Sequence, residues 1–276
     1  MGIVNVTPDS FSDGGRHADA GAAIAHGLRL AAAGADLLDV GGESTRPGAK
    51  PVDEAEELAR VLPVIEALVA RAAVPVAIDT TKPAVMRAAL AAGASVVNDV
   101  HALRSEGALA AVAASGAAVV LMHMQGEPRT MQAAPHYDDV VGEVHRFLAE
   151  RVFACEMAGI DKRRLVIDPG FGFGKTLEHN LALLAQLRRF TELGVPVLAG
   201  LSRKSSLGVI TGRAVGDRLA ASLAAHLIAV QNGAAIVRVH DVAETVDALK
   251  VWTALAAVPM PKGKSAASPI RWPDED

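Results

Sequence analysis

A short phrase repeats along this chain and restricts the folds that it can adopt. Each copy is an Ala-rich segment of helical character, then a glycine, then a short apolar run, and copies lie at 31–40, 90–100, 113–122, 156–170, 192–202 and 231–242. The glycine stands where the end of a helix favours a left-handed residue. The apolar run is too short for a helix and lacks clean alternation, which is typical of a parallel strand buried on both faces. The phrase therefore predicts alternating helices and parallel strands.

Two further apolar runs, Ile3–Val6 and Pro75–Thr80, raise the number of predicted strands to eight; the other six start near Asp36, Ser95, Ala118, Leu165, Pro196 and Ala235. Between them we predict helices, one over 51–71 with Asp53 and Glu56 as a capping pair, one opened by Thr81 and Pro83, and one opened at Ser105. Eight alternating units predict an α/β fold with parallel pairing. The rival is a doubly wound open sheet. The evenness of the repeats and the lack of a dinucleotide fingerprint favour a single (βα)8 TIM barrel, with its active site at the C-terminal ends of the strands.

Composition fits one large core. Of 276 residues, 51% are hydrophobic but only 3% are aromatic, so the core must consist of Ala, Val, Leu and Ile. We assign residues 1–257 to the barrel and 258–276, with four prolines and no periodicity, to a flexible tail. We interpret Cys155, the only cysteine, as a small core residue.

The net charge and the hydropathy of the chain exclude some classes of partner. The net charge is −4 and no basic stripe is present, so we expect no nucleic-acid partner. No signal peptide is visible and no apolar run is long enough to span a bilayer. We therefore expect a soluble, cytoplasmic protein with no membrane partner.

Polar residues follow nearly every predicted strand. They are Asn5, Glu43–Arg46, Asp79, Asn98–Asp99, His123, Asp168, Ser202–Lys204, Arg238 and His240. Because chemistry in a (βα)8 enzyme sits at the carboxyl ends of the strands, these side chains should converge on one mouth.

Each of these residues also has a structural interpretation. Asp79 or Asn98 alone would more often cap the next helix, and we interpret His123 as a core histidine and Asp39 as a structural loop contact. Arg238 and Lys204 could be surface ion pairs. However, Arg238 lies inside the apolar stretch 237–239, so it needs a partner or a ligand.

Taken together, these residues fit a ligand with a flat heterocycle and a phosphate group. Asp168 and Asn98 suit a flat heterocycle with ring N–H and amino donors, and Lys204 can donate to a carbonyl on its far edge. The guanidinium of Arg238 can lie over a π face, and with Asn5 and His240 it could meet a phosphate group. Asn5 also supplies a hard oxygen suited to Mg2+.

Other catalytic motifs fail on their spacing. The segment 168–176 mimics a P-loop, but Pro169 stands where a Walker A motif needs glycine, so an NTPase is disfavoured. We interpret Gly170–Gly174 as a loop whose backbone passes close to a ligand, with Phe173 as an apolar wall. The sequence has no HExxH zinc motif and no GxSxG serine motif.

Several long motifs in order resemble the dihydropteroate synthase family over about residues 1–256. They are MGIVNVTPDSFSDGG (1–15), DVGGESTRPGA (39–49), IDTTKP (78–83), VNDV (97–100), LMHMQGEPRTMQ (121–132), DPGFGFGKT (168–176), GLSRKS (200–205) and VRVHDV (237–242). The resemblance implies that reduced pterin pyrophosphate reacts with p-aminobenzoate, by departure of pyrophosphate before the aniline nitrogen attacks. It also implies a Mg2+ cofactor, competition by sulfonamides, and a homodimer, which an apolar helix at 218–231 would allow.

The resemblance also implies residue roles. The pterin would be held by Asp79, Asn98, Asp168, Phe173, Lys204 and Arg238, the last stacking on it. The pyrophosphate would meet Asn5, Arg46, Arg238 and His240, with Asn5 at the metal. The p-aminobenzoate side would be formed by Phe11, Thr45, Arg46, Pro47 and Ser205. Catalytic residues would be Asp13, Arg46, Lys204, Arg238 and His240; Phe11 and Asp13 fall in a first mobile loop. Family members usually carry a hairpin ahead of the first strand, so we expect a chain that starts at Met1 to be less heat-stable than an extended one.

Two alternatives share the pterin-holding residues. A pterin-barrel methyltransferase that passes a methyl group from a folate to a corrinoid would have no need for the STRPG segment at 44–48, nor for Arg238 and His240 as a pyrophosphate site. A non-catalytic pterin-binding paralogue is disfavoured by the presence of Asn5, Asp13, Arg46, Lys204 and His240. The intact set favours the synthase.

Overall fold

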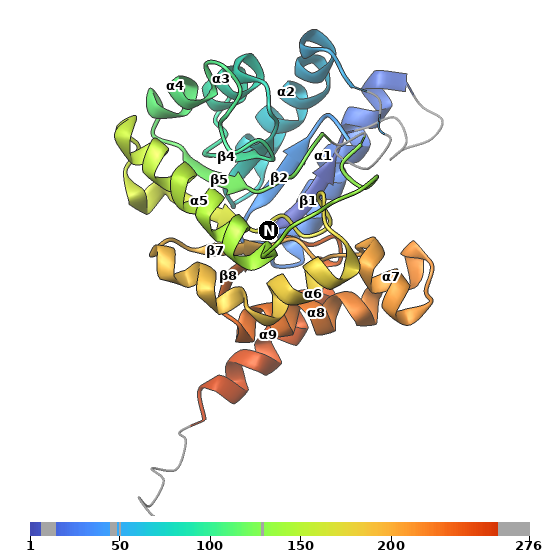
Figure 1. The fold of residues 1–276 in the computed structure, drawn as a ribbon. Helices are drawn as coiled ribbons and strands as arrows, with labels where there is room; N and C mark the ends of the chain where they lie inside the picture. Colours follow the sequence, from blue (N-terminus) through green and yellow to red (C-terminus); the bar gives the residue numbers. More distant parts are fainter. Residues whose placement is uncertain (7–14, 45–48, 50, 128–129, 259–276) are drawn as a thin grey trace, which may run out of the picture.

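The computed structural model describes residues 1–6, 15–44, 49, 51–127 and 130–258; for 15–19 it describes the backbone only. Its centre is one eight-stranded sheet in which every strand is parallel to its neighbours (Figure 1). The strands run in sequence order and are β1 Gly2–Asn5, β2 Leu38–Gly41, β3 Val76–Asp79, β4 Val96–Asp99, β5 Ala118–Met122, β6 Leu165–Asp168, β7 Val197–Ala199 and β8 Ala234–Val237. A doubly wound sheet would reverse this order at a switch point.

Helices surround the sheet (Figure 1). They are α1 Gly15–Ala32, α2 Glu54–Arg71, α3 Pro83–Ala91, α4 Ala108–Ala113, α5 Val140–Met157, α6 Leu177–Ala185, α7 Ser205–Thr211, α8 Leu219–Gln231 and α9 Val242–Ala256, with 3-10 turns at Lys162–Arg164, Leu187–Leu193 and Val215–Asp217. No helix among the described residues is long and apolar enough to cross a membrane.

The first and last strands also meet. Val239, two residues beyond β8, forms a parallel bridge with Gly2, and the Ile3 amide donates to the Val239 carbonyl at 3.0 Å. The Val239 amide in turn donates to the Met1 carbonyl at 2.9 Å. These contacts bring the residue two positions beyond β8 next to β1, so the sheet is curled.

Most predicted boundaries agree with these elements. Every strand overlaps its predicted segment, and Asp53 caps α2 by accepting a hydrogen bond from the Glu56 amide at 2.7 Å. The start predicted at Ser105 is wrong, because α4 begins only at Ala108. The glycine before it, Gly107, has φ +83°, a left-handed conformation that interrupts a helix.

Two apolar layers pack against the sheet. The larger one lies between strands and helices and includes Phe190, Leu68 and Cys155, so the interpretation of Cys155 as a core residue is confirmed. A smaller cluster of Met1, Ala77, Val120 and Leu198 is separate from it. Aromatic side chains contribute little to either layer, as the composition predicts. The proposed tail lies outside the described residues from position 259 onward.

Candidate active site

The register of the strands brings their polar ends to one level. Asn5 pairs with Gly41, Gly41 with Asp79, and Asp79 with Asn98, while on the other side Met122 pairs with Asp168. Because all strands are parallel, these residues lie at the same carboxyl-terminal edge. The predicted convergence of polar strand ends is therefore confirmed for these positions.

Arg238 is at the centre of a buried polar cluster. Its Nε donates to Asp39 Oδ2 at 2.6 Å and its Nη2 donates to Asp79 Oδ2 at 2.8 Å. Asn98 Nδ2 donates to the same Asp39 oxygen at 3.1 Å. These contacts give Arg238 the partner that its apolar surroundings required, so it is not a surface ion pair.

Asp39 corrects one expectation. It lies within β2, fully buried, and joins Arg238 to Asn98, so its interpretation as a structural loop contact is wrong. The helix-capping interpretation of Asp79 and Asn98 is also wrong, because α3 begins after Lys82 and α4 after Gly107, both without a side-chain cap. The signal for Asp39 was present in the sequence: like Arg238, it is a charged residue inside an apolar stretch, and burial requires a partner for it.

Burial and neighbouring charges shift the pKa values of Asp79 and Arg238 in this cluster. Burial raises the pKa of Asp79 to about 7, against the opposing charge of Arg238, and the neighbouring carboxylates Asp39 and Glu57 raise it further. Burial lowers the pKa of Arg238, but Asp39 and Asp79 outweigh this effect and raise it above its usual range. Arg238 therefore stays charged.

A second group lies at the ends of β6 and β7. Asp168 Oδ1 accepts a hydrogen bond from the Gly170 amide at 2.7 Å. Burial raises the pKa of Asp168, which the Gly170 amide and the charge of Lys204 oppose. Lys204 places its Nζ 4.2 Å from the centre of the Phe173 ring, within the range of a cation–π contact. Carboxylate, cation and aromatic face therefore stand together, as recognition of a flat polar ring requires.

A third group follows β7 and β8. The backbone amide of His240 donates to Ser202 Oγ at 3.1 Å, and His240 Nδ1 lies 3.0 Å from the same oxygen. Arg203 has φ +55° and forms an ion pair with Asp241, which fixes the backbone before Lys204. Ser205 is exposed at the start of α7, and Asn5 is partly exposed at the end of β1. Five predicted site residues lie outside the described residues: Phe11, Asp13, Thr45, Arg46 and Pro47.

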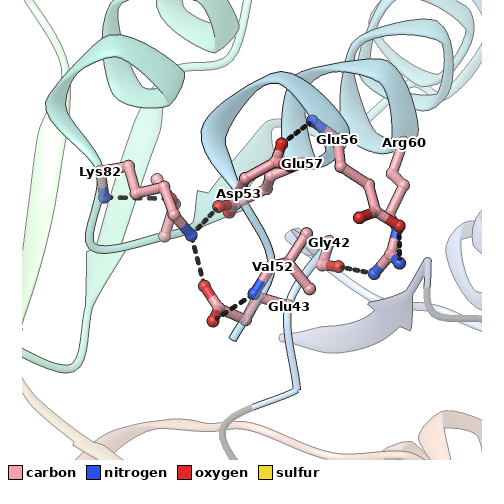
Figure 2. A network of polar contacts seen from close by, with 9 residues as sticks. Gly42, Glu43, Val52, Asp53, Glu56, Glu57, Arg60 and Lys82 are labelled. Atoms are coloured by element: carbon pink, nitrogen blue, oxygen red, sulfur yellow. Dashed lines mark hydrogen bonds and ion pairs between the residues drawn. The ribbon is translucent and has the colours of Figure 1, made fainter. Parts of the chain in front are cut away.

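An ionic network holds the ends of the segment that carries Thr45–Pro47 (Figure 2). Glu43 Oε1 accepts a hydrogen bond from the Val52 amide at 3.1 Å, and its other oxygen pairs with Lys82. Lys82 Nζ also lies 2.5 Å from Glu57 Oε2. The network therefore connects Glu43 and Val52, the two flanks of the segment, to α2 and α3.

Sequence reasoning missed Glu57 and Lys82. Glu57 has no exposed side-chain surface, and on α2 it falls on the same face as the buried residues Val61, Val64 and Leu68. A charged residue at a core position of an amphipathic helix was the available signal. His123 was interpreted as a core histidine; this is confirmed, since it is 7% exposed and its ring packs edge-on against Phe147 at 4.9 Å.

Comparisons with known proteins agree with this arrangement. A family model described as pterin binding enzyme matches residues 1–240. Dihydropteroate synthase of Escherichia coli K12 is 53% identical over 251 residues, 91% of this chain and 89% of that protein. A solved structure of Xanthomonas albilineans dihydropteroate synthase with 4-aminobenzoic acid is 68% identical with a TM-score of 0.90, over 94% of this chain and 93% of that one. The same enzyme in complex with 7,8-dihydropteroate is 65% identical with a TM-score of 0.87, over 94% of each chain.

Proposed function

Because the chain belongs to the pterin-binding enzyme family, we propose that it catalyses the dihydropteroate synthase reaction of folate biosynthesis. In this reaction 6-hydroxymethyl-7,8-dihydropterin pyrophosphate and p-aminobenzoate give 7,8-dihydropteroate and pyrophosphate. The observation that carries the proposal is the buried cluster of Asp39, Asp79, Asn98 and Arg238 beside Asp168 and Lys204. The chain also has 68% and 65% sequence identity to two solved structures of dihydropteroate synthase, which supports the same activity.

The pterin half of the site would use hydrogen bonds and stacking. Asp168 and Asn98 would meet the amino and N–H donors of the pterin, and Lys204 its carbonyl. Phe173 would border the ring. Because Asp39 and Asp79 hold the guanidinium of Arg238 through its N–H donors, the face of the guanidinium can stack on the pterin.

The pyrophosphate half would lie over Asn5, Arg238 and His240, with Arg46 joining from the segment after β2. Asn5 fits a Mg2+ ion because its amide oxygen is a hard ligand at the strand end, and Mg2+ completes its shell with phosphate oxygens and water. Among the described residues no group of three or more His, Cys, Asp or Glu side chains could hold a metal, so one protein ligand is consistent with this mode. Bound there, Mg2+ would neutralise charge on the pyrophosphate.

The p-aminobenzoate half would be formed by Phe11, Thr45, Arg46, Pro47 and Ser205. Sulfonamides would compete here, because they resemble p-aminobenzoate in shape and charge. The Glu43–Lys82–Glu57 network would hold the flanks of this half (Figure 2).

The mechanism we propose is dissociative. The C–O bond to pyrophosphate breaks with its electron pair on the leaving oxygen, while Arg46, Arg238 and His240 stabilise the departing anion. The pterin methylene is left as a cation, which Asp13 and Asp79 stabilise and Lys204 keeps in position. The aniline nitrogen then attacks this carbon and releases its proton to solvent. No covalent enzyme intermediate is needed, so orientation and electrostatics carry the catalysis.

Three further properties of the protein belong to the same proposal: the closure of the barrel, the oligomeric state and the cellular location. We propose a closed (βα)8 barrel, supported by the Gly2–Val239 bridge. We propose a homodimer formed through α7 and α8, where Val209, Ile210 and Ile228 are exposed apolar residues. We place the reaction in the cytoplasm, because a pyrophosphate substrate is a multiply charged molecule that does not cross a bilayer unaided.

Pyrophosphate release tests the function. It would be measured with the pterin pyrophosphate and Mg2+, with and without p-aminobenzoate, on the wild type and Lys204→Ala. We expect release that depends on p-aminobenzoate, yields dihydropteroate and collapses in the variant. Pterin binding without release would favour the non-catalytic paralogue. Methyl transfer from a methylated folate to a corrinoid would favour the methyltransferase.

A further inference from the structure

Lys175 is a buried lysine whose ammonium group is fully occupied by its own loop and a neighbouring strand. It is only 3% exposed. Its Nζ lies 3.0 Å from His123 Nδ1, 3.0 Å from the Phe173 carbonyl and 3.4 Å from the His123 carbonyl. Three acceptors match the three donors of an ammonium group. These contacts join the loop after β6 to the end of β5.

The acceptor on His123 is held in place by packing. Burial lowers the pKa of His123 to about 2, and the charge of Lys175 lowers it further, so the ring is neutral. Its ring lies at 90° to Phe147 and tilts against Tyr137 at 6.1 Å. A neutral imidazole whose Nδ1 faces an ammonium accepts a hydrogen bond there and carries its own proton on Nε2.

The loop after β6 needs such a tie because glycines build it. Gly170, Gly172 and Gly174 have φ between +61° and +79°. Glycine adopts this and many other conformations freely, so these residues do not by themselves fix the backbone of the loop. A Cβ on Gly170 would stand 1.9 Å from the His123 carbonyl, and one on Gly174 would stand 2.3 Å from the Gln125 carbonyl. The backbone is thus pressed against the segment after β5 and has no side chains at these positions to hold it.

Two sides of the pterin pocket are set by this loop. Its Gly170 amide donates to Asp168, and its Phe173 ring lies under the Lys204 ammonium. A Cβ on Gly172 would come within 3.2 Å of Lys204 Cδ, so the loop backbone also supports that side chain. A shift of the loop would therefore move Asp168's donor, Phe173 and Lys204 together.

Charge couples Lys175 to the same pocket. Lys175 and Lys204 both favour the ionised form of Asp168, as does Arg238, whereas burial opposes it. The groups that face Lys175 are His123 just after β5, Asp168 from β6 and Lys204 before α7. Burial, opposed by Asp168, lowers the pKa of Lys175 to about 7.

We propose that Lys175 is a positioning residue for pterin binding, which holds the Gly170–Gly174 loop against His123 and places its positive charge near Asp168. This inference rests on the proposed function, because it takes Asp168, Phe173 and Lys204 as the pterin-binding residues. Lys175 itself contacts loop and strand, so it acts through these residues.

The test uses Lys175→Met, with Lys250→Met as the matched control, since Lys250 is an exposed lysine on α9. Binding of 6-hydroxymethylpterin would be measured by calorimetry from pH 5 to pH 9, together with Tm and both KM values. We expect Lys175→Met to weaken pterin binding at least tenfold at pH 6, below the pKa of Lys175, and to shift the acid loss of binding to higher pH. The KM for p-aminobenzoate should change less than threefold.

Two results would overturn the inference: pterin affinity equal to that of the wild type, or a lower Tm with an unshifted acid limb, which is what a merely structural lysine would give. If Lys175→Met does not fold, Lys175→Gln keeps a donor without the charge and must still shift the acid limb. If the wild type binds no pterin, the proposed function itself is wrong. If the wild type binds pterin and Lys175→Met binds it equally well, only this inference is wrong.

Discussion

Asp79→Asn should make the protein more stable and less able to bind the pterin. Asp79 is 13% exposed at its side chain and its pKa rises from 3.8 to about 7, mainly because of burial. A carboxyl group with a raised folded pKa binds its proton more tightly when folded, so the contribution of Asp79 to stability is greatest below about pH 4 and is lost as pH rises through 7. At about 1.4 kcal/mol per tenfold change in proton affinity, ionised Asp79 costs the folded state about 4 kcal/mol at pH 8. An amide of the same shape avoids most of that cost and can still accept the hydrogen bond of Arg238.

Urea unfolding of both proteins between pH 4 and pH 8 would measure this effect. The difference in unfolding free energy should be near zero at pH 4 and should grow to about 2–4 kcal/mol in favour of Asp79→Asn at pH 8, since the amide gives up the charge attraction of Arg238. Pterin affinity at pH 8 should fall at least tenfold. A variant that is less stable at pH 8, or a difference that does not change with pH, would refute the reasoning that burial dominates at Asp79.

Three further predictions concern other buried groups and the metal. Lys82→Met should lower the unfolding free energy by about 3–5 kcal/mol because it leaves Glu57 buried and charged, and adding Glu57→Gln should recover at least half; a loss below about 1 kcal/mol in urea unfolding would contradict this. His226 is 2% exposed and burial lowers its pKa to about 4, so its contribution to stability is lost as pH falls from 6.5 towards 4. Between pH 7.5 and pH 5.0 the wild type should therefore lose about 2 kcal/mol more than His226→Leu in urea unfolding, and equal losses would count against it. Asn5→Ala should raise the Mg2+ concentration for half-maximal pyrophosphate release about tenfold; an unchanged requirement would remove Asn5 from the metal site.

The fold was predictable because local signals and the global arrangement agree. Glycines ended the helices, apolar runs gave the buried strands, and eight such units specified a parallel sheet in sequence order. The errors lie where local chemistry has several solutions. Ser105 is a good cap by type, yet the left-handed Gly107 moves the start of α4 to Ala108.

The convergence of polar strand ends was predictable from the sequence, but the contacts between these side chains were not. Arg238 was found because a cation inside an apolar strand needs a partner, and the same argument applied to Asp39 would have found that partner. Glu57 and Lys82 lie 25 positions apart in the sequence, and only the packing of α2 beside α3 brings them together. Such pairings depend on tertiary geometry, which periodicity and spacing do not contain.

The burial of carboxylates in the site lowers the stability of the folded protein, and the same carboxylates have a role in the proposed reaction. Asp39 and Asp168 are buried and Asp79 is partly buried, and burial raises the pKa of Asp79 and Asp168 despite Arg238 and Lys204. Carboxylates that have lost contact with water favour a cation that develops beside them, so ionisation of the pterin methylene would offset part of the same burial cost that weakens the folded state. The stability gained in Asp79→Asn and the pterin affinity and turnover lost in it should then have a common electrostatic origin. If turnover survived that substitution while stability rose, the carboxylates would serve the fold's polar network rather than the reaction.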